Sequence, residues 1–352
     1  MLIDQFYKGK RVLVTGHTGF KGSWLSLWLI EMGAIVTGFS IDSGDKYSIF
    51  NIFNLKNKLT NIQANIKDFN MLLNTINKTN FDIIFHLAAQ PIVKESYIDP
   101  TNTFLTNIVG TMNLLEAIRI NSKVKSAIIV TTDKVYENVN QKVGYIETDK
   151  LGGFDPYSAS KASAEIVTQS YIKSYFSNNN SCNIATVRAG NVIGGGDWSK
   201  YRLIPDIVRS IETNVQLEVR YPLAVRPWQH VLEPLSGYLE LAKRLFEGEI
   251  DKQGSWNFGP YEKEVYKVKD VLNSFKINFP NLNVIDVSKS IHSHEASLLL
   301  LNIDKSIKNL NWKPRFDFHK AIELTVEWYK SYRSPNIKEI TLNQLRLYNK
   351  LL

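Results

Sequence analysis

The sequence predicts an α/β protein with a doubly wound, mostly parallel sheet and a smaller lobe towards the C-terminus. The first half of the chain alternates short apolar runs with longer stretches of helical period. This alternation is typical of parallel strands that are covered by helices on both faces. A glycine-rich turn follows the first apolar run. Because ligands of such sheets bind beyond the carboxyl ends of the strands, functional residues are expected there.

Each apolar run is interpreted as a buried strand that ends in small or polar residues. The expected strands are residues 11–16, 34–40, 81–89, 126–132 and 183–190. The helical stretches between them are residues 22–32, 67–79, 100–120 and 156–176. From about Gly194 the pattern loosens, and loop-rich pieces holding Arg, Trp and His favour a substrate-covering lobe over further sheet.

The amino-acid composition indicates the class of protein to which the chain belongs. With 352 residues, 44% of them hydrophobic and 22% charged, the chain matches an ordinary soluble globular protein. No apolar run approaches the roughly 20 residues of a membrane span, and no basic leader with an apolar region opens the sequence. The single Cys182 excludes an internal disulfide framework and a Cys-rich metal site. We therefore expect a cytoplasmic protein without membrane contact and without a metal.

The net charge of +8 suits an anionic partner. The lysines are scattered, with no basic block or basic–aromatic stripe that could follow a phosphate backbone. A small anionic ligand is therefore favoured over nucleic acid.

Gly16, Gly19 and Gly22 follow the first strand with the spacing G-x-x-G-x-x-G, at the mouth of a helix. Glycines let the backbone approach a pyrophosphate, and the helix N-terminus adds N–H donors and the positive end of its dipole. In this position the pattern predicts a dinucleotide site. Asp42, near the end of the second strand, is either the carboxylate that binds the ribose or a solvated turn residue. No Arg follows that strand, so NAD is favoured over NADP.

The stretch DPYSASKASAE opens a helix that carries a tyrosine and a lysine one turn apart. Asp155 is suited to cap this helix and Pro156 to occupy its first position. Tyr157 and Lys161, at i and i+4, then lie on one face. A nearby ammonium favours phenolate, so Lys161 is expected to lower the pKa of Tyr157. The alternative is a surface Tyr and Lys on an amphipathic helix, which the upstream glycine turn disfavours.

With these motifs the chain resembles the extended short-chain dehydrogenase/reductase family, which pairs T-G-x-x-G-F-x-G with Y-x-x-x-K. Within that family it looks like the sugar-nucleotide dehydratases, and among these like the branch that acts on CDP-glucose. The stretches that carry the resemblance are GHTGFKGSWLSLWL, FHLAAQP, TTDK, YEN, GGFDPYSASKASAE, RAGNVIGGGDW, RLIPD and RPWQHVLEPL. They cover most of residues 11–238.

The resemblance implies an NAD-binding Rossmann-type domain over residues 1–190, which carries the catalytic residues. It implies a mainly substrate-binding lobe over residues 191–352, with the two parts able to interleave. The activity implied is conversion of CDP-glucose to CDP-4-keto-6-deoxyglucose plus water, through transient oxidation at C4, elimination across C5 and C6, and hydride return to C6. Family members commonly dimerise through helices that match residues 100–120 and the helix of Tyr157, so a homodimer or homotetramer is expected.

The resemblance also assigns catalytic roles to Thr132, Asp133, Lys134, Tyr157 and Lys161. Tyr157 takes the O4 proton while Thr132 holds that oxygen. Asp133 is the acid that protonates the leaving C6 hydroxyl, and Lys134 is the base at C5. Asp133 must then be protonated and Lys134 neutral, which burial and, for the lysine, a second cation such as Lys161 promote. Outside such a context, an Asp-Lys pair at a strand end is a solvated turn.

Matching positions assign the binding residues. Cofactor contacts fall on Gly16, Thr18, Gly19, Phe20, Gly22, Asn65, Ile66, Leu87, Ala88, Ala89, Tyr157 and Lys161. Substrate contacts fall on Gln90, Asn191, Arg202, Arg226 and His230. The two arginines match diphosphate contacts, for which a guanidinium is well shaped.

Other assignments stay open. His230 and His86 also fit structural histidines, because no metal partners accompany them, and Trp198 and Trp228 either stack on a base or fill the core of the lobe. Two positions depart from the family pattern. Asn65 replaces an Asp that accepts from the adenine amino group, although its amide oxygen can still accept. Val135 stands where Cys is expected and should pack under the site.

Two other functions remain. An epimerase of the family, or a dehydratase for another sugar nucleotide, shares Tyr157 and Lys161. An epimerase has no use for an acid–base pair after Thr132, however, and dehydratases for dTDP- or GDP-sugars usually carry Glu in place of Lys134. A non-enzymatic NAD-sensing regulator tends to lose the Tyr or the Lys, and both are present.

Overall fold

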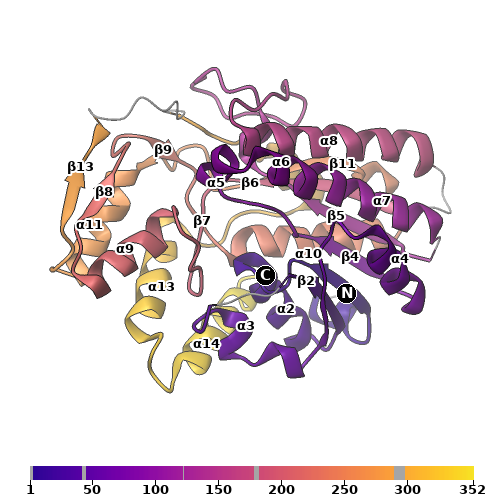
Figure 1. Cartoon of the computed structure of the whole chain (residues 1–352), viewed down its shortest axis with the longest axis horizontal. Helices are drawn as coiled ribbons and strands as arrows, with labels where there is room; N and C mark the ends of the chain where they lie inside the picture. The colour runs from indigo at the N-terminus through magenta and orange to yellow at the C-terminus, as the bar shows by residue number, and fades with distance from the viewer. Residues whose placement is uncertain (1–2, 42–44, 122, 178–181, 289–297) are drawn as a thin grey trace.

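The computed structural model describes residues 3–41, 45–121, 123–177, 182–288 and 298–352. In this part of the chain the centre is a parallel sheet of seven strands in the order β11-β6-β5-β4-β1-β2-β3 (Figure 1). The strands are β1 (Arg11–Thr15), β2 (Ile35–Ser40), β3 (Thr60–Gln63), β4 (Ile83–His86), β5 (Ser126–Val130), β6 (Asn183–Ala189) and β11 (Gly254–Phe258). The order reverses between β1 and β4, and doubly wound sheets bind ligands at the carboxyl ends beside such a reversal.

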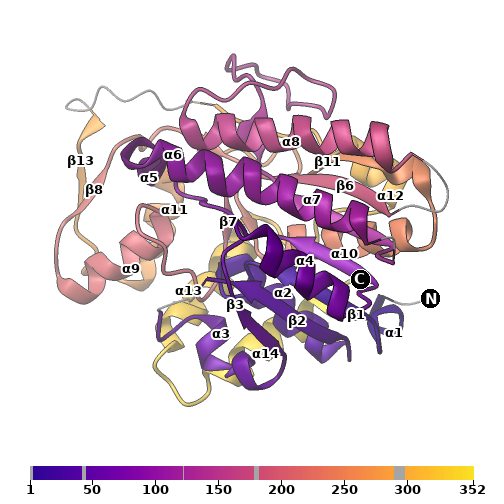
Figure 2. The ribbon, with the colours of Figure 1, turned by 45° about the vertical axis from the view of Figure 1, so that its right-hand side comes forward.

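Helices cover both faces of the sheet because successive residues of a strand point to opposite sides. In β5, Ile128 and Val130 join one hydrophobic cluster, whereas Ala127 and Ile129 join the other. The first cluster is covered by α2 (Phe20–Glu31) and α10 (Leu232–Phe246). The second is covered by α4 (Phe69–Lys78), α7 (Gly110–Ile120) and α8 (Pro156–Tyr175), which lie side by side in Figure 2.

The predicted helix over residues 100–120 is continuous but changes its winding. It consists of α6 (Pro100–Phe104), a π-helical turn η2 (Leu105–Val109) and α7. The other predicted helices lie within about two residues of their expected bounds, in keeping with the usual uncertainty of helix ends.

Two strands of the sheet were not expected from the sequence. β3 has the residues Thr-Asn-Ile-Gln and is an edge strand, so it lacks the apolar run that marks a buried strand. β11 comes from beyond residue 191 and pairs with β6 at the opposite edge. The loosened pattern after Gly194 indicated no further strand of this sheet, yet β11 joins it, and α10 from the same region packs under the sheet.

The remaining elements form the lobe at the left of Figure 1 and short connections. There β8 (Leu217–Val219) pairs in parallel with β13 (Val284–Asp286), beside α9 (Leu203–Thr213) and α11 (Val268–Asn278). The other elements are α1 (Ile3–Tyr7), α3 (Ile49–Ile52), η1 (Leu55–Asn57), α5 (Val93–Ile98), η3 (Asp133–Val135), β7 (Val192–Ile193), β9 (Val225–Arg226), β10 (Gln229–His230), η4 (Ile250–Lys252), β12 (Tyr266–Lys267), α12 (Asp304–Leu310), α13 (Phe318–Ser331) and α14 (Ile337–Asn349). Among the described helices, none has the length and hydropathy that crossing a bilayer requires.

Candidate active site

The glycine turn after β1 is packed too closely for any side chain. Gly16 has φ of 71°, in the left-handed region, and a Cβ there would lie 2.7 Å from the backbone nitrogen of Ala88. A Cβ on Gly22 would lie 2.1 Å from the carbonyl oxygen of Gly16. Gly19 is the N-cap of α2 and has no side chain to satisfy the first N–H groups of the helix. This cradle at the reversal of the sheet fits a pyrophosphate.

Other positions predicted to hold the cofactor lie within this turn and after the neighbouring strands β2 and β3. Thr18 shares a hydrogen bond of 2.8 Å with Ser40 and donates to the carbonyl of Ile41 at 3.1 Å, so it ties the turn to the end of β2. The Asn65 side-chain oxygen accepts from the backbone nitrogen of Lys67 at 3.0 Å, which leaves one lone pair for a ligand. Ile66 is buried in the core, and Asp42 lies outside the described residues.

The loop after β4 meets the glycine turn. The Ala88 nitrogen donates to Thr15 Oγ1 at 3.2 Å, and Thr15 in turn bonds His86 Nδ1 at 2.8 Å. Burial, followed by the charge of Lys161, lowers the pKa of His86 to about 3, so this histidine is a neutral structural one. Leu87 and Ala88 therefore border the cradle, as the sequence predicts.

Gln90, predicted to contact substrate, uses its side chain within the loop. Its Nε2 donates to Thr103 Oγ1 at 2.8 Å and its Oε1 accepts from the Ile92 nitrogen at 2.6 Å. Its backbone nitrogen donates to Asn107, and Asn107 also donates to Ser160 on α8 at 2.8 Å. Gln90 thus couples this loop to the helix that carries Tyr157.

The motif after β5 forms a buried turn, not a solvated one. Thr132 caps η3 and donates from Oγ1 to Asp133 Oδ1 at 3.0 Å. Asp133 is 2% exposed, and its second oxygen Oδ2 has no hydrogen-bond partner in the described chain. Burial raises the pKa of Asp133, as the acid role requires, while the charge of partly buried Lys134 opposes this shift. Val135 is fully buried under the turn, as expected.

Helix α8 begins as the sequence predicts. Asp155 accepts from the Ser158 nitrogen at 2.9 Å and Pro156 occupies the first turn. Tyr157 and Lys161 are both nearly buried, at 8% and 5% exposed. They are thus no surface pair on an amphipathic helix.

The expected pKa of Tyr157 was wrong in direction for the free protein. Burial raises the pKa of Tyr157 to about 12, while the Thr132 hydroxyl and then the charge of Arg202 act to lower it. Lys161 donates to the Val130 carbonyl at 3.0 Å, and burial lowers its own pKa to about 8. Desolvation is the largest cause of both pKa shifts, and neither group is among the causes of the other's shift, which spacing along a helix cannot reveal.

A buried ion pair behind the catalytic helix was not predicted. Glu165, one turn after Lys161, binds Arg188 of β6 through two contacts of 2.9 Å. Thr131 and Thr186 donate to the same carboxylate at 2.5 and 2.7 Å. Every oxygen of Glu165 is thus bonded, and the pair locks α8 to β5 and β6. Glu165 ends the quoted stretch at i+8 from Tyr157, which is the sequence signal for its place on the same face.

The predicted substrate residues divide into two groups. Arg202 precedes α9, bonds Asp197 at 3.0 Å and acts electrostatically on Tyr157, and Arg226 likewise acts on Asp133. Both arginines therefore lie near the residues predicted to be catalytic. Asn191 is partly buried before β7, where its carbonyl accepts from the Gln229 nitrogen at 3.0 Å.

His230 is not brought to the site. It is 0% exposed and lies edge-on to the rings of Trp24 and Phe316, so its side chain is packed in the core. Burial lowers its pKa to about 3. The substrate assignment of His230 is thus corrected to that of a neutral core histidine. Trp198 packs against Tyr329 and Tyr332, which favours the core role for this tryptophan.

Lys21 is a further cation at this edge of the sheet. It is the second residue of α2 and only partly exposed. The charges of Arg202, Asp133, Lys161 and Asp197 all act on it. The sequence signal was the Lys within the quoted stretch GHTGFKG, one residue before Gly22.

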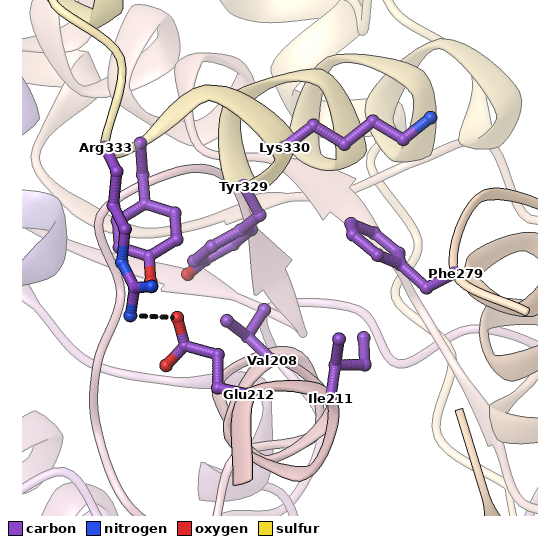
Figure 3. A pocket seen from close by; sticks show the side chains of 8 residues that line it. Val208, Ile211, Glu212, Phe279, Tyr329, Lys330 and Arg333 are labelled. Carbon is purple, nitrogen blue, oxygen red and sulfur yellow. Dashed lines mark hydrogen bonds and ion pairs between the residues drawn. The ribbon is translucent and has the colours of Figure 1, made fainter. Parts of the chain in front are cut away.

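A hollow of about 290 Å³ lies away from these groups, between α9 and α13. Figure 3 shows Arg333 and Glu212 at its side, joined by an ion pair of 2.8 Å, with Phe279 opposite Tyr329. Tyr329 also donates to the Asp197 carbonyl at 2.6 Å. None of the predicted catalytic residues lines this hollow.

Fold and site together define a protein of the dinucleotide-dependent dehydrogenase/reductase class, because the glycine cradle and the Tyr-Lys pair meet at the reversal of a parallel sheet. The chain belongs to the GDP-mannose 4,6 dehydratase family, whose model matches residues 13–325. It is 44% identical over 337 residues to the CDP-glucose 4,6-dehydratase of Salmonella typhimurium, covering 94% of each chain.

Solved structures share the fold. DesIV from Streptomyces venezuelae, a dTDP-glucose 4,6-dehydratase with NAD and TYD bound, matches with a TM-score of 0.77, 22% identity and coverage of 92% of this chain and 98% of that one. The epimerase Mth375 from Methanothermobacter thermautotrophicus matches with a TM-score of 0.81 and 24% identity, covering 96% of both chains.

Proposed function

We propose that this protein is a CDP-glucose 4,6-dehydratase that forms CDP-4-keto-6-deoxyglucose and water. The observation that carries the proposal is the buried Thr132-Asp133-Lys134 turn next to Tyr157, in a chain that is 44% identical to a CDP-glucose 4,6-dehydratase. An epimerase of the same fold needs no such acid–base pair. Lys134, where other dehydratases usually carry Glu, favours the CDP-sugar.

NAD is the cofactor we propose. The cradle of Gly16, Gly19 and Gly22 would hold its pyrophosphate, with Asn65 at the adenine and Tyr157 and Lys161 at the other end. When bound, a nicotinamide dinucleotide supplies reversible hydride acceptance, which makes the C5 hydrogen of the sugar acidic by creating a C4 ketone.

Tyr157 is assigned the role of the base that accepts the proton of the C4 hydroxyl. In the free protein its pKa of about 12 keeps the phenol protonated, so the phenol must become a better base when ligands fill the site. Arg202 already acts in that direction, and Lys161 lies one turn further along α8. Thr132 lies next to the phenol and is placed to orient O4.

Elimination needs one base and one acid. Lys134 removes the C5 proton, and Asp133 donates its proton to the C6 hydroxyl, which leaves as water. Burial raises the pKa of Asp133, which favours its protonated form, and its unbonded Oδ2 is available to the leaving oxygen. The Thr132 hydroxyl connects Tyr157 with Asp133, so the proton gained by the phenol can return to the acid. When the hydride taken from C4 is returned to C6, the protonated Lys134 gives its proton back to C5, so atoms, electrons and protons balance over one turnover.

We further propose a cytoplasmic homodimer or homotetramer built on the α6–α7 and α8 faces. Apolar side chains on these helices are exposed, including Leu105 at 43%, Met112 at 40% and Ile166 at 60%. Light scattering of the purified protein tests this oligomeric state, and a monomer at micromolar concentration contradicts it.

The dehydratase activity is tested by mass spectrometry of sugar nucleotides that have been incubated with the protein.

A further inference from the structure

Lys21 is a cation in a place where a helix favours anions. It lies in the first turn of α2, directly after the glycine turn, and that first turn contains no acidic residue. The N-terminal end of a helix carries partial positive charge from its free N–H groups, which repels an ammonium. A charged lysine at this position is therefore electrostatically unfavourable.

Lys21 also has no counter-ion among the residues that the structure describes. In the part of the chain that the structure describes it makes no ion pair and no hydrogen bond, although it is only partly exposed. The two carboxylates that act on it are engaged elsewhere. Asp197 pairs with Arg202 at 3.0 Å, and Asp133 accepts from Thr132 and is held towards its neutral form by burial. The remaining neighbours, Arg202 and Lys161, are cations.

We propose that Lys21 binds a diphosphate ester. The negative charge of this ligand is the counter-ion that the described residues do not supply. This inference rests on the proposed function, since both the sugar nucleotide and the dinucleotide cofactor bring a diphosphate to this edge of the sheet. Lys21 directly follows the glycine turn in the first turn of α2, and the charge of Arg202, a predicted diphosphate contact, acts on it. A lysine suits this role as a mobile point charge beside the fixed fork of an arginine.

Binding should be coupled to uptake of a proton. Burial first, then the charges of Arg202 and Lys161, lower the pKa of Lys21 to about 7, against the opposing charges of Asp133 and Asp197. A bound diphosphate raises that pKa again. Above pH 7 the free protein has lost this proton whereas the complex retains it, so the affinity must fall as the pH rises from 7 to 9.

The test is calorimetric titration of the full-length protein with NAD and, separately, with CDP-glucose, at pH 8 in two buffers of different ionisation enthalpy. Lys21→Met removes the charge at similar length, and Lys21→Arg keeps a permanent charge. Lys56→Met, an exposed lysine in η1, is the matched control. Thermal unfolding of each variant establishes that it is folded.

We expect the wild type to take up most of a proton with at least one of the two ligands. Lys21→Met should bind that ligand about 10-fold or more weakly, the usual cost of losing a charge-assisted hydrogen bond. Lys21→Arg should bind within about threefold of wild type but without proton uptake. If Lys21→Met weakens the binding of NAD alone, Lys21 binds the cofactor diphosphate. If it weakens the binding of CDP-glucose alone, Lys21 binds the substrate diphosphate.

The inference is overturned if Lys21→Met binds both ligands like the wild type, or if proton uptake persists in Lys21→Arg. These outcomes are separable from failure of the proposed function. A wild type that shows proton uptake dependent on Lys21 yet dehydrates no sugar nucleotide refutes the activity and leaves the inference standing. Dehydration of CDP-glucose with unchanged binding by Lys21→Met refutes the inference alone.

Discussion

At the scale of single residues, burial decides what the titratable groups at this site can do. Asp133 is displaced towards its protonated form and Lys161 towards its neutral form, because each loses hydration on folding. Tyr157 moves away from the phenolate for the same reason. The raised pKa of Asp133 is in the direction that an acid for elimination of the C6 hydroxyl requires.

Replacing Lys134 by Ala should separate the two halves of the reaction. Without the base, the C5 proton stays in place, so deuterium from heavy water should no longer enter C5. Product formation should fall by about 10²- to 10⁴-fold, the usual contribution of a positioned base. Absorbance at 340 nm should still report oxidation at C4. A Lys134→Ala variant that dehydrates at the wild-type rate would show that another group is the base.

Replacing Lys161 by Met should stabilise the fold while abolishing activity. The pKa of Lys161 is lowered from 10.5 to about 8 on folding, mainly by burial. Its charged form therefore opposes folding below pH 8, and this cost disappears as the pH rises towards 10.5. We expect a gain of about 1–3 kcal/mol in the free energy of unfolding at pH 7, measured by urea denaturation. A loss of stability at pH 7 would contradict this explanation.

At the scale of elements, α8 is held at its start and in its middle. Asp155 caps the first turn, and Glu165 binds Arg188 of β6 where both side chains are at most 2% exposed. Between these two anchors lie Tyr157 and Lys161. A helix fixed in this way holds the face of Tyr157 and Lys161 in one orientation, so we expect the ion pair to position these two predicted catalytic residues.

Replacing one member of this ion pair should lower the free energy of unfolding far more than replacing both members together. Glu165→Gln leaves the guanidinium of Arg188 buried without its counter-ion, and we expect a loss of about 3–5 kcal/mol. The double variant Glu165→Gln/Arg188→Met should be more stable than the sum of the two single losses implies. Denaturant unfolding of the four proteins measures the coupling. Strict additivity would mean that the pair is not a structural unit.

At the scale of the whole molecule, the C-terminal segment is tied to the helix under the sheet by one buried carboxylate. Glu233 of α10 accepts from the Phe316 nitrogen at 2.6 Å, from the Arg315 nitrogen at 3.0 Å and from the Tyr348 hydroxyl at 2.8 Å. Burial raises its pKa to about 7 despite these bonds. The last helix, α14, is thereby joined to the Rossmann core.

The carboxylate of Glu233 should make the stability of the fold dependent on pH. Its folded pKa lies above the unfolded value of 4.5, so its contribution is fully present below pH 4.5 and is lost as the pH rises through 7. Relative to Glu233→Gln, the wild type should lose up to about 3 kcal/mol over this interval. Thermal unfolding from pH 4.5 to 8 compares the two proteins. Parallel curves would contradict the shifted pKa.

Sequence patterns correctly predicted the structural features that depend on the spacing of residues close together in the chain. The turn of Gly16 and the cap of Asp155 both follow from residue type at a fixed offset, and the structure confirms them. Patterns failed where the outcome depends on distant contacts. β11 joins the sheet through pairing with β6, and His230 is enclosed by Trp24 and Phe316 from other elements. The direction of the Tyr157 pKa shift failed likewise, because desolvation is a property of the folded molecule.

The most direct test of the central claim is incubation of the purified protein and NAD with CDP-glucose, dTDP-glucose and GDP-mannose in separate reactions, followed by mass spectrometry. We expect that CDP-glucose loses one molecule of water and that the other two sugar nucleotides are converted far more slowly or not at all. Loss of water from none of the three, or from dTDP-glucose alone, would contradict it.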